Sequence, residues 1–238
     1  MMTGVLRAFG LDMRRIASQG MFLILVLLIG FPMAMVLLGS ISGGTSYMPG
    51  AAVGGVSGML AMLPLTAFTF EQQGQNNWMN GVIPVRRIHQ VIGRYLVVGA
   101  CVLILALEVA FCTGAGMWFE SGAIQFPGLA ASVLVTVVIY VLLESVMLPL
   151  CYRFTYQKAL LTMMFICIGL GALVAAVFAL LAKLAPDAID AVLSWVVSVE
   201  SLSGAGMIWL ALGGIVLAAF AAAVSFAASL CIYLAKEF

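Results

Sequence analysis

Six long runs of apolar residues, separated by short polar segments, set the pattern of this chain of 238 residues. A helix needs about 20 predominantly apolar residues to cross a hydrocarbon layer about 30 Å thick. The runs therefore predict transmembrane helices at Met21–Leu38, Ala51–Phe70, Tyr95–Phe119, Gly128–Leu150, Ala159–Ala182 and Met207–Leu234. We expect an all-α polytopic membrane protein in which residues 1–238 form one transmembrane domain.

The composition excludes an ordinary soluble domain. Hydrophobic residues make up 65% of the chain and charged residues 8%, whereas a soluble domain has about 25% charged residues. The formal net charge of +1 averages basic and acidic segments on opposite sides of the predicted membrane. The net charge therefore identifies no partner.

Basic residues lie almost entirely on one side of the predicted spans. Loops that stay in the cytoplasm hold most of the lysine and arginine of a membrane protein. One set of segments carries Arg7, Arg14, Arg15, Arg86, Arg87, Arg94, Arg153, Lys158 and Lys236, and the opposite set carries Lys183 alone. We expect a multi-pass protein of the cell (cytoplasmic) membrane with both termini in the cytoplasm.

Two segments outside the spans have helical patterns of their own. In residues 1–19 the apolar positions recur at roughly helical spacing, at Val5, Leu6, Phe9, Met13 and Ile16. The charged residues, Asp12 among them, lie elsewhere on the wheel, a pattern typical of a helix in the inner membrane interface. Residues 183–206 contain Pro186 and Asp187, which favour a helix start, but the segment is too short to span. We expect a short extracellular helix there, before the sixth span.

Glycines at intervals of four residues mark the second predicted span. Gly50, Gly54 and Gly58 form a ridge of small residues, which allows a neighbouring helix to pack closely. Residues 55–58 read GVSG, the serine motif of rhomboid proteases. A serine nucleophile needs a base within hydrogen-bond reach, and His89, the one histidine, is predicted on the opposite side of the membrane from Ser57. We interpret the motif as part of the packing ridge.

The chain offers no pattern typical of a metal, disulfide or nucleotide site. Its cysteines lack paired spacing; they are Cys101, Cys112, Cys151, Cys167 and Cys231. A phosphate loop places a lysine between glycine and serine or threonine, and no lysine here follows a glycine. We expect no cofactor in this chain, no catalytic residues and no enzymatic activity.

Two carboxyl groups inside the predicted spans are candidates for a transport pathway, because intramembrane carboxylates are costly and usually face a bundle interior or a wet cavity. Glu108 lies near the middle of the third span. We expect it to be either a pathway residue or a neutral, hydrogen-bonded structural residue. Glu144 lies near the inner end of the fourth span. We expect Glu144 to reach Arg153 or the interface, with a substrate role as the alternative.

The most polar passage, FEQQGQNNWMNGVIPVRRIHQVIGRY at residues 70–95, joins the second and third predicted spans. A positively charged anchor with an interfacial tryptophan explains the arginines, and Arg94, nearest the bilayer, is expected to be such an anchor. It does not explain so much polar, turn-forming sequence. Because Pro84 favours a helix start, we expect a short polar helix, a turn near Asn80 and Gly81, and a second helix that leads into the third span.

This passage resembles the corresponding loop in the membrane subunits of type-2 ATP-binding-cassette exporters, particularly the small six-span permeases. That family commonly carries an acidic residue, a tryptophan, the sequence LPVSR and a KY pair that enters the third span. The matching residues here are Glu71, Trp78, IPVRR at residues 83–87 and Arg94 with Tyr95. The differences are Gln72 for a second acid, Ile83 for leucine, Arg86 for serine and Arg94 for lysine.

The resemblance implies that residues 71–94 form a coupling loop whose helix docks on a separate cytoplasmic ATPase. The implied ATPase-coupling residues are Glu71, Trp78, Pro84, Arg86 and Arg87. ATP and Mg would bind to that partner, and a second permease subunit would complete a homo- or heterodimer in the lipid bilayer, without nucleic acid. The implied export substrate is hydrophobic or amphipathic. The alternative is a secondary transporter or channel with Glu108 as its ion or proton site.

Overall fold

The computed structural model describes residues 2–18, 48–72, 86–184 and 204–235, together with positions 30, 34, 37, 38, 41 and 194. Its helices are α1 (Met2–Ser18), α4 (Met48–Gln72), α6 (Arg87–Ser121), α7 (Phe126–Arg153), α8 (Tyr156–Leu184) and α10 (Gly204–Ala235). The described part of the chain contains helices and no strands, which confirms the all-α class expected from the sequence.

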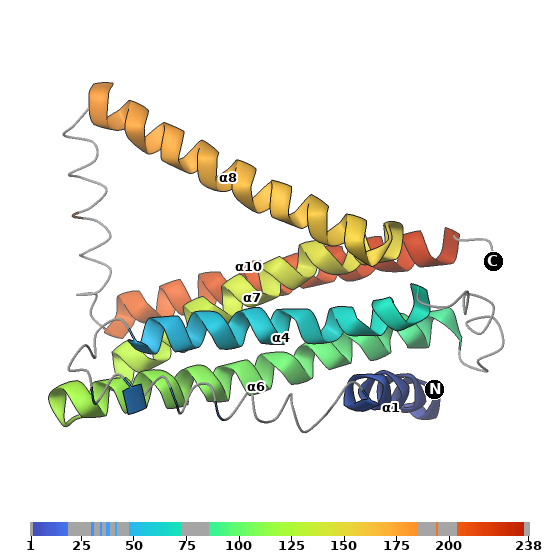
Figure 1. Cartoon of the computed structure of the whole chain (residues 1–238), viewed down its shortest axis with the longest axis horizontal. Helices are drawn as coiled ribbons and strands as arrows, with labels where there is room; N and C mark the ends of the chain where they lie inside the picture. Colours follow the sequence, from blue (N-terminus) through green and yellow to red (C-terminus); the bar gives the residue numbers. More distant parts are fainter. Residues whose placement is uncertain are drawn as a thin grey trace.

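Four helices, α4, α6, α7 and α10, run lengthwise beside one another and form the body of the molecule (Figure 1). α6 packs along α4 and α7, and α7 packs along α10. α8 touches α7 and α4, then diverges from the bundle along its length. α1 is seen almost end-on in Figure 1, so it crosses the direction of the other helices beside the beginning of α6. We call this part of the bundle, where the beginning of α6 and the end of α10 also lie, the α1 end.

Four of the expected spans are confirmed as helices long and apolar enough to cross a membrane: Arg87–Phe119, Phe126–Arg153, Tyr156–Leu181 and Ala211–Leu234. The second expected span is helical, as α4, within which the described side chains form the apolar stretch Val53–Thr69. The first expected span and the expected extracellular helix lie almost wholly outside the described residues. A total of six spans therefore stays a prediction.

The two ends of α6 show why the helix has these limits. At its start, the backbone of Arg86 is extended, and its carbonyl accepts hydrogen bonds from the amides of His89 at 2.8 Å and Gln90 at 3.3 Å. At its end, Gly122 takes a left-handed φ of 69° and donates to the carbonyl of Trp118 at 2.9 Å. Glycine is the residue that most readily closes a helix in this way. α6 thus includes residues 87–94, which precede the third expected span.

The buried core lies between α4, α6 and α7, and it is continued by one residue each from α1, α8 and α10. Its fully buried members include Val56, Leu60, Leu105, Leu148 and Tyr152, with Ile16 and Tyr233 at its margin. Most of the large apolar side chains on α8 are exposed, as expected of a surface that meets lipid or another membrane helix.

Candidate functional site

The expected coupling loop leads directly into the α1 end of the bundle. Glu71 lies in the last turn of α4, Arg86 is exposed immediately before α6, and Arg87 is half-buried at its first position. Trp78 and Pro84 lie outside the described residues. The structure thus describes residues 71–72 and 86–94 of the expected loop, with 87–94 as the beginning of α6, and the docking role of the loop stays a prediction.

α1 packs closely against the first turns of α6. A β carbon at Gly4 would lie 2.6 Å from Nδ1 of His89, and His89 itself is buried. One turn further along α6, a β carbon at Gly93 would lie 2.9 Å from Cβ of Ala8 and 3.0 Å from the amide nitrogen of Phe9. Glycine at these two positions therefore permits a contact that any side chain would obstruct.

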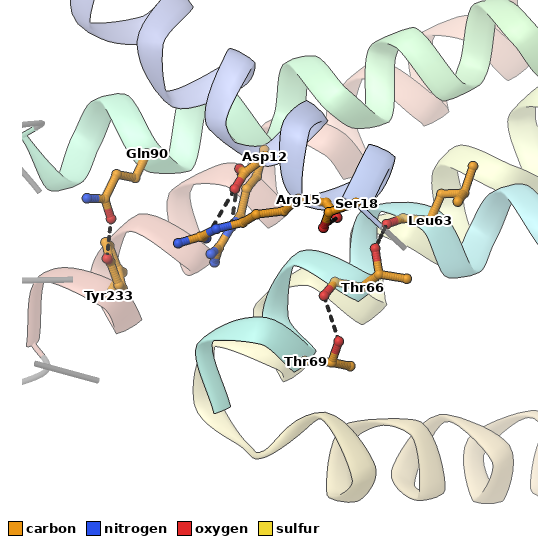
Figure 2. A network of polar contacts seen from close by, with 9 residues as sticks. Asp12, Arg15, Ser18, Leu63, Thr66, Thr69, Gln90 and Tyr233 are labelled. Carbon is orange, nitrogen blue, oxygen red and sulfur yellow. Dashed lines mark hydrogen bonds and ion pairs between the residues drawn. The ribbon is translucent and has the colours of Figure 1, made fainter. Parts of the chain in front are cut away.

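A buried acid–base cluster lies in this contact. Arg15 donates from Nη1 to Oδ1 of Asp12 at 3.4 Å, one turn away on α1. Nε of Arg94 on α6 lies 3.8 Å from Oδ2 of Asp12, so an ion pair joins the two helices. Asp12 is 6% exposed and Arg94 4% exposed. Figure 2 shows Asp12 and Arg15 close together beside α6.

Aromatic rings cover the Arg94 guanidinium. Its central carbon lies 4.0 Å from the ring centre of Phe68 on α4 and 5.2 Å from that of Tyr152 on α7. Attraction between a cation and an aromatic face is stronger where water is excluded. Tyr152 also packs against Tyr233 of α10, with ring centres 5.3 Å apart. One side chain of α6 is thereby in contact with α1, α4 and α7, and through Tyr152 it is connected to α10.

Two further polar contacts tie α6 to α10. The hydroxyl of Tyr233 donates to Oε1 of Gln90, and the hydroxyl of Tyr95 lies 2.6 Å from Oγ of Ser225 and 3.0 Å from Oγ of Ser229. Figure 2 shows the contact of Gln90 with Tyr233. The first turns of α6 are therefore connected to α10 as well as to α1.

The two candidate pathway carboxyls differ in burial. Glu144 is 2% exposed, lies beside Tyr140 and Cys101, and its Oε2 accepts no hydrogen bond from any described residue. Glu108 is half-buried in the middle of α6, beside Cys112. The hydroxyl of Tyr140 donates to the carbonyl of Leu60 at 3.2 Å and so links α7 to α4 next to Glu144.

Three sequence-based expectations need correction. Asp12, expected on the polar face of an interfacial helix, is buried against α6, and Arg94, expected as a bilayer anchor, is buried among aromatic rings. Glu144, expected to reach Arg153 or the interface, is buried within the bundle, where its neighbours come from α6 and from its own helix. The sequence contained a signal of the contact between α1 and α6. Gly4, Ala8 and Asp12 are spaced four residues apart, as are His89 and Gly93, so each set lies on one helix face.

The predicted glycine ridge does not meet another helix within the described part of the chain. Gly54 and Gly58 are exposed, and a β carbon at either position would have no neighbour within 4 Å. Gly50 lies in the first turn of α4. The packing role of the ridge stays a prediction, for a partner other than the described helices.

Two other features concern the ligands that the molecule could bind. An apolar hollow of about 500 Å³ lies beside the second half of α6 and is lined by Leu37, Ala110, Phe111, Ala115, Trp118 and Ile124, among others. Among the described residues, no three His, Cys, Asp or Glu side chains are grouped as metal ligands would be. The hollow offers contacts to apolar groups and almost no polar partner.

Comparison with known proteins identifies the family. The sequence model of the ABC-2 family transporter proteins matches residues 10–234, from α1 to the end of α10. Neither the curated proteins nor the solved structures contain a match to this chain. Because the match extends over nearly the whole sequence, from the middle of α1 to the last turn of α10, the chain belongs to the ABC-2 family of transporter proteins, as a membrane permease subunit.

Proposed function

We propose that the chain is the membrane-spanning subunit of an ABC exporter driven by a separate cytoplasmic ATPase. The observation that carries the proposal is the family match over residues 10–234. The working assembly would contain two permease subunits, identical or different, and ATPase subunits that bind ATP and Mg. The permease itself has no enzymatic role in this proposal.

We assign the α1 end of the bundle to the cytoplasmic side. The distribution of arginine and lysine supports this orientation, and it places both termini in the cytoplasm of a six-span protein. α1 then lies in the inner interface, which fits its crosswise direction in Figure 1. Its exposed face carries Leu6, Leu11 and Met13 together with Arg7 and Arg14, a combination suited to acyl chains and lipid phosphates.

We assign the docking surface for the ATPase to residues 71–87. Glu71 and Arg86 border this segment at the α1 end, and Trp78 and Pro84 lie inside it. Tryptophan and arginine are the residue types that most often dominate binding energy at protein interfaces. The substrate class that we assign is hydrophobic or amphipathic, and the apolar hollow beside α6 supports it.

The test is recovery of the ATPase with the tagged permease at matched membrane expression. We expect the unaltered chain to co-purify an ATPase and to hydrolyse no ATP alone. We expect Trp78→Ala, and to a lesser degree Glu71→Ala, to lower recovery while thermal stability stays near normal. Truncation at an interface hot spot costs roughly 2 kcal/mol, which corresponds to about 30-fold in affinity. Trp78→Phe is the matched control for an aromatic anchor.

Two results would contradict the proposal. Robust ATPase activity in the homogeneous chain would show that the permease is itself an enzyme. Transport that persists without an ATPase and collapses with the proton gradient would favour a secondary transporter with Glu108 as its ion or proton site. Full ATPase recovery with Trp78→Ala would remove the docking role of the loop while leaving the family assignment intact.

A further inference from the structure

The buried ion pair between Asp12 and Arg94 is an unusual way to attach a short helix to a membrane bundle. Removing two charges from water is costly, and a buried pair often stabilises a protein no better than apolar residues of similar size. Asp12 and Arg94 are 6% and 4% exposed, and the two partners come from different helices. A charged pair in such a place fixes relative position, because neither group can leave its partner without a large cost.

The rest of the described contact between α1 and α6 is made by close packing around small residues. It includes Gly4, Ala8 and Gly93, whose small size brings the helix backbones together. The opposite face of α1 exposes Leu6 and Arg7. The ion pair adds a charged contact between the two helices to this close packing and so helps to set where α1 sits along α6.

Arg94 is also close to the segment that we assign to the ATPase. α6 begins at Arg87, directly after that segment, and Arg94 follows two turns later, about 10 Å along the helix axis. A helix transmits displacement along its axis because its hydrogen bonds keep the turns together. A movement of the docking segment thus reaches Arg94 through continuous helix.

We propose that Asp12 and Arg94 are positioning residues for ATP-driven transport: their ion pair fastens α1 to the first turns of α6, so that α1 moves with the ATPase-docking segment. This inference rests on the proposed function. Phe68 and Tyr152 hold the guanidinium from α4 and α7, so the same side chain carries the movement into the spans. Arg15, which shares the Asp12 carboxylate, keeps that carboxylate oriented.

The test follows α1 in the complex of the full chain with its ATPase, in lipid nanodiscs. A bimane fluorophore is attached through Arg14→Cys, in a chain that also carries Cys167→Ser and Cys231→Ser to remove the exposed native thiols. ATP with vanadate is the probe of nucleotide-driven movement. Complex recovery and thermal stability are measured for each variant, so that loss of folding is separated from loss of the response.

We expect Asp12→Asn to leave the ATPase bound and to lower the ATP-induced change in fluorescence about fivefold or more, the lower end of typical coupling between sites. Arg94→Gln should behave in the same way. Arg94→Lys retains the positive charge and should keep most of the response. Lys158→Gln, at the exposed start of α8, is the matched control for the loss of one charge and should respond fully.

A disulfide offers a rescue that a merely stabilising role does not predict. A β carbon at Gly4 would lie 2.6 Å from Nδ1 and 3.5 Å from Cγ of His89, so side chains at the two positions face one another across the contact. We expect Gly4→Cys with His89→Cys to cross-link on oxidation and to restore the response in the Asp12→Asn chain. Reduction should abolish the rescue.

Three results would overturn the inference: a full response in Asp12→Asn, a complete cross-link that restores nothing, or no response of α1 in the unaltered complex. In each of these cases the ATPase still co-purifies, so the proposed function stands. If instead no ATPase is recovered with the unaltered chain, the proposed function fails and the inference falls with it.

Discussion

The hydroxyl of Tyr95 on α6 lies 2.6 Å from Oγ of Ser225 on α10. Its neighbour Arg94 points elsewhere, toward Asp12 of α1 and Phe68 of α4, because successive residues of a helix are rotated by about 100°. Two consecutive residues thus connect the beginning of α6 to opposite parts of the molecule. This is the segment that enters the membrane after the proposed docking loop.

Tyr95→Phe tests the connection to α10. The substitution keeps the ring that packs edge-on against Phe226 but removes the hydroxyl shared with Ser225 and Ser229, both of which are buried. We expect the free energy of unfolding to fall by about 1 to 3 kcal/mol, because buried polar groups lose their partner. Thermal unfolding in detergent, followed by intrinsic fluorescence, measures the change.

Thr162→Val is the matched control for Tyr95→Phe. Its hydroxyl donates to the carbonyl of Lys158 in the same helix, at 2.7 Å, so its loss breaks no contact between helices. We expect an effect well below that of Tyr95→Phe. An unchanged unfolding temperature for Tyr95→Phe would mean that the two serines find other partners.

The buried carboxyl of Glu144 gives a second prediction. Glutamine has the same shape and carries no charge, so Glu144→Gln should leave the thermal stability of the folded protein unchanged or raised. Glu144→Ala should destabilise it by about 2 kcal/mol or more, because a large side chain is lost from a packed site. Unfolding curves of both variants check this, and destabilisation by glutamine would show that the carboxylate itself is required.

Glu108 is expected to behave differently, because it is half-buried in the middle of α6. If it lines the transport pathway, Glu108→Gln alters ATP-driven transport, or its pH dependence, while the folded protein stays intact. Transport can be followed in proteoliposomes with an amphipathic fluorescent dye. Unchanged transport over a wide pH range would leave Glu108 as a structural residue.

The reactivity of the cysteines tests the packing of the whole bundle. Cys101, Cys112 and Cys151 are buried, and Cys167 and Cys231 are exposed. N-ethylmaleimide should therefore label Cys167 and Cys231 before the three buried thiols in the detergent-solubilised protein, and all five after denaturation. Mass spectrometry of the labelled peptides identifies the sites. Cys151 lies on α7, in the buried core. Rapid labelling of this cysteine would contradict the packing of the bundle.

Local patterns in the sequence were sufficient for the long spans. A run of apolar residues has one stable form in lipid, a helix with all backbone hydrogen bonds made internally, and α6, α7, α8 and α10 follow from that rule. The helical spacing of the apolar positions in residues 1–19 likewise predicted the helix that the structure has at Met2–Ser18.

Contacts between residues far apart in the sequence could not be predicted from such local patterns. Asp12 was expected at the polar surface of α1 because an acid on an amphipathic helix usually faces water. Its burial follows from Arg94, which lies far away in the sequence and comes close only when α1 packs across α6. Glu144 was misplaced for a related reason: depth in the membrane can be estimated from sequence, but the direction in which a side chain points cannot.

Two glycines of α6 allow a direct test of the contact with α1. A β carbon at Gly93 would lie 2.9 Å from Cβ of Ala8, whereas one at Gly99 would meet nothing within 4 Å. We expect Gly93→Ala to destabilise the protein by about 1 to 3 kcal/mol through overpacking. Gly99→Ala should be neutral or stabilising by roughly 0.5 to 1 kcal/mol, because alanine is the better helix former.

Limited trypsin digestion in detergent shows which part of the Gly93→Ala variant is destabilised. If α1 is displaced, cleavage after Arg15, which is half-buried in the cluster with Asp12, should accelerate, while cleavage after the exposed Arg153 should not. Adding Ala8→Gly removes the nearest of these contacts and leaves those with the amide nitrogen of Phe9 at 3.0 Å and the carbonyl carbon of residue 8 at 3.2 Å. The double variant should therefore recover only part of the lost stability. Equal digestion of Gly93→Ala and Gly99→Ala would mean that α1 does not pack on α6 at Gly93.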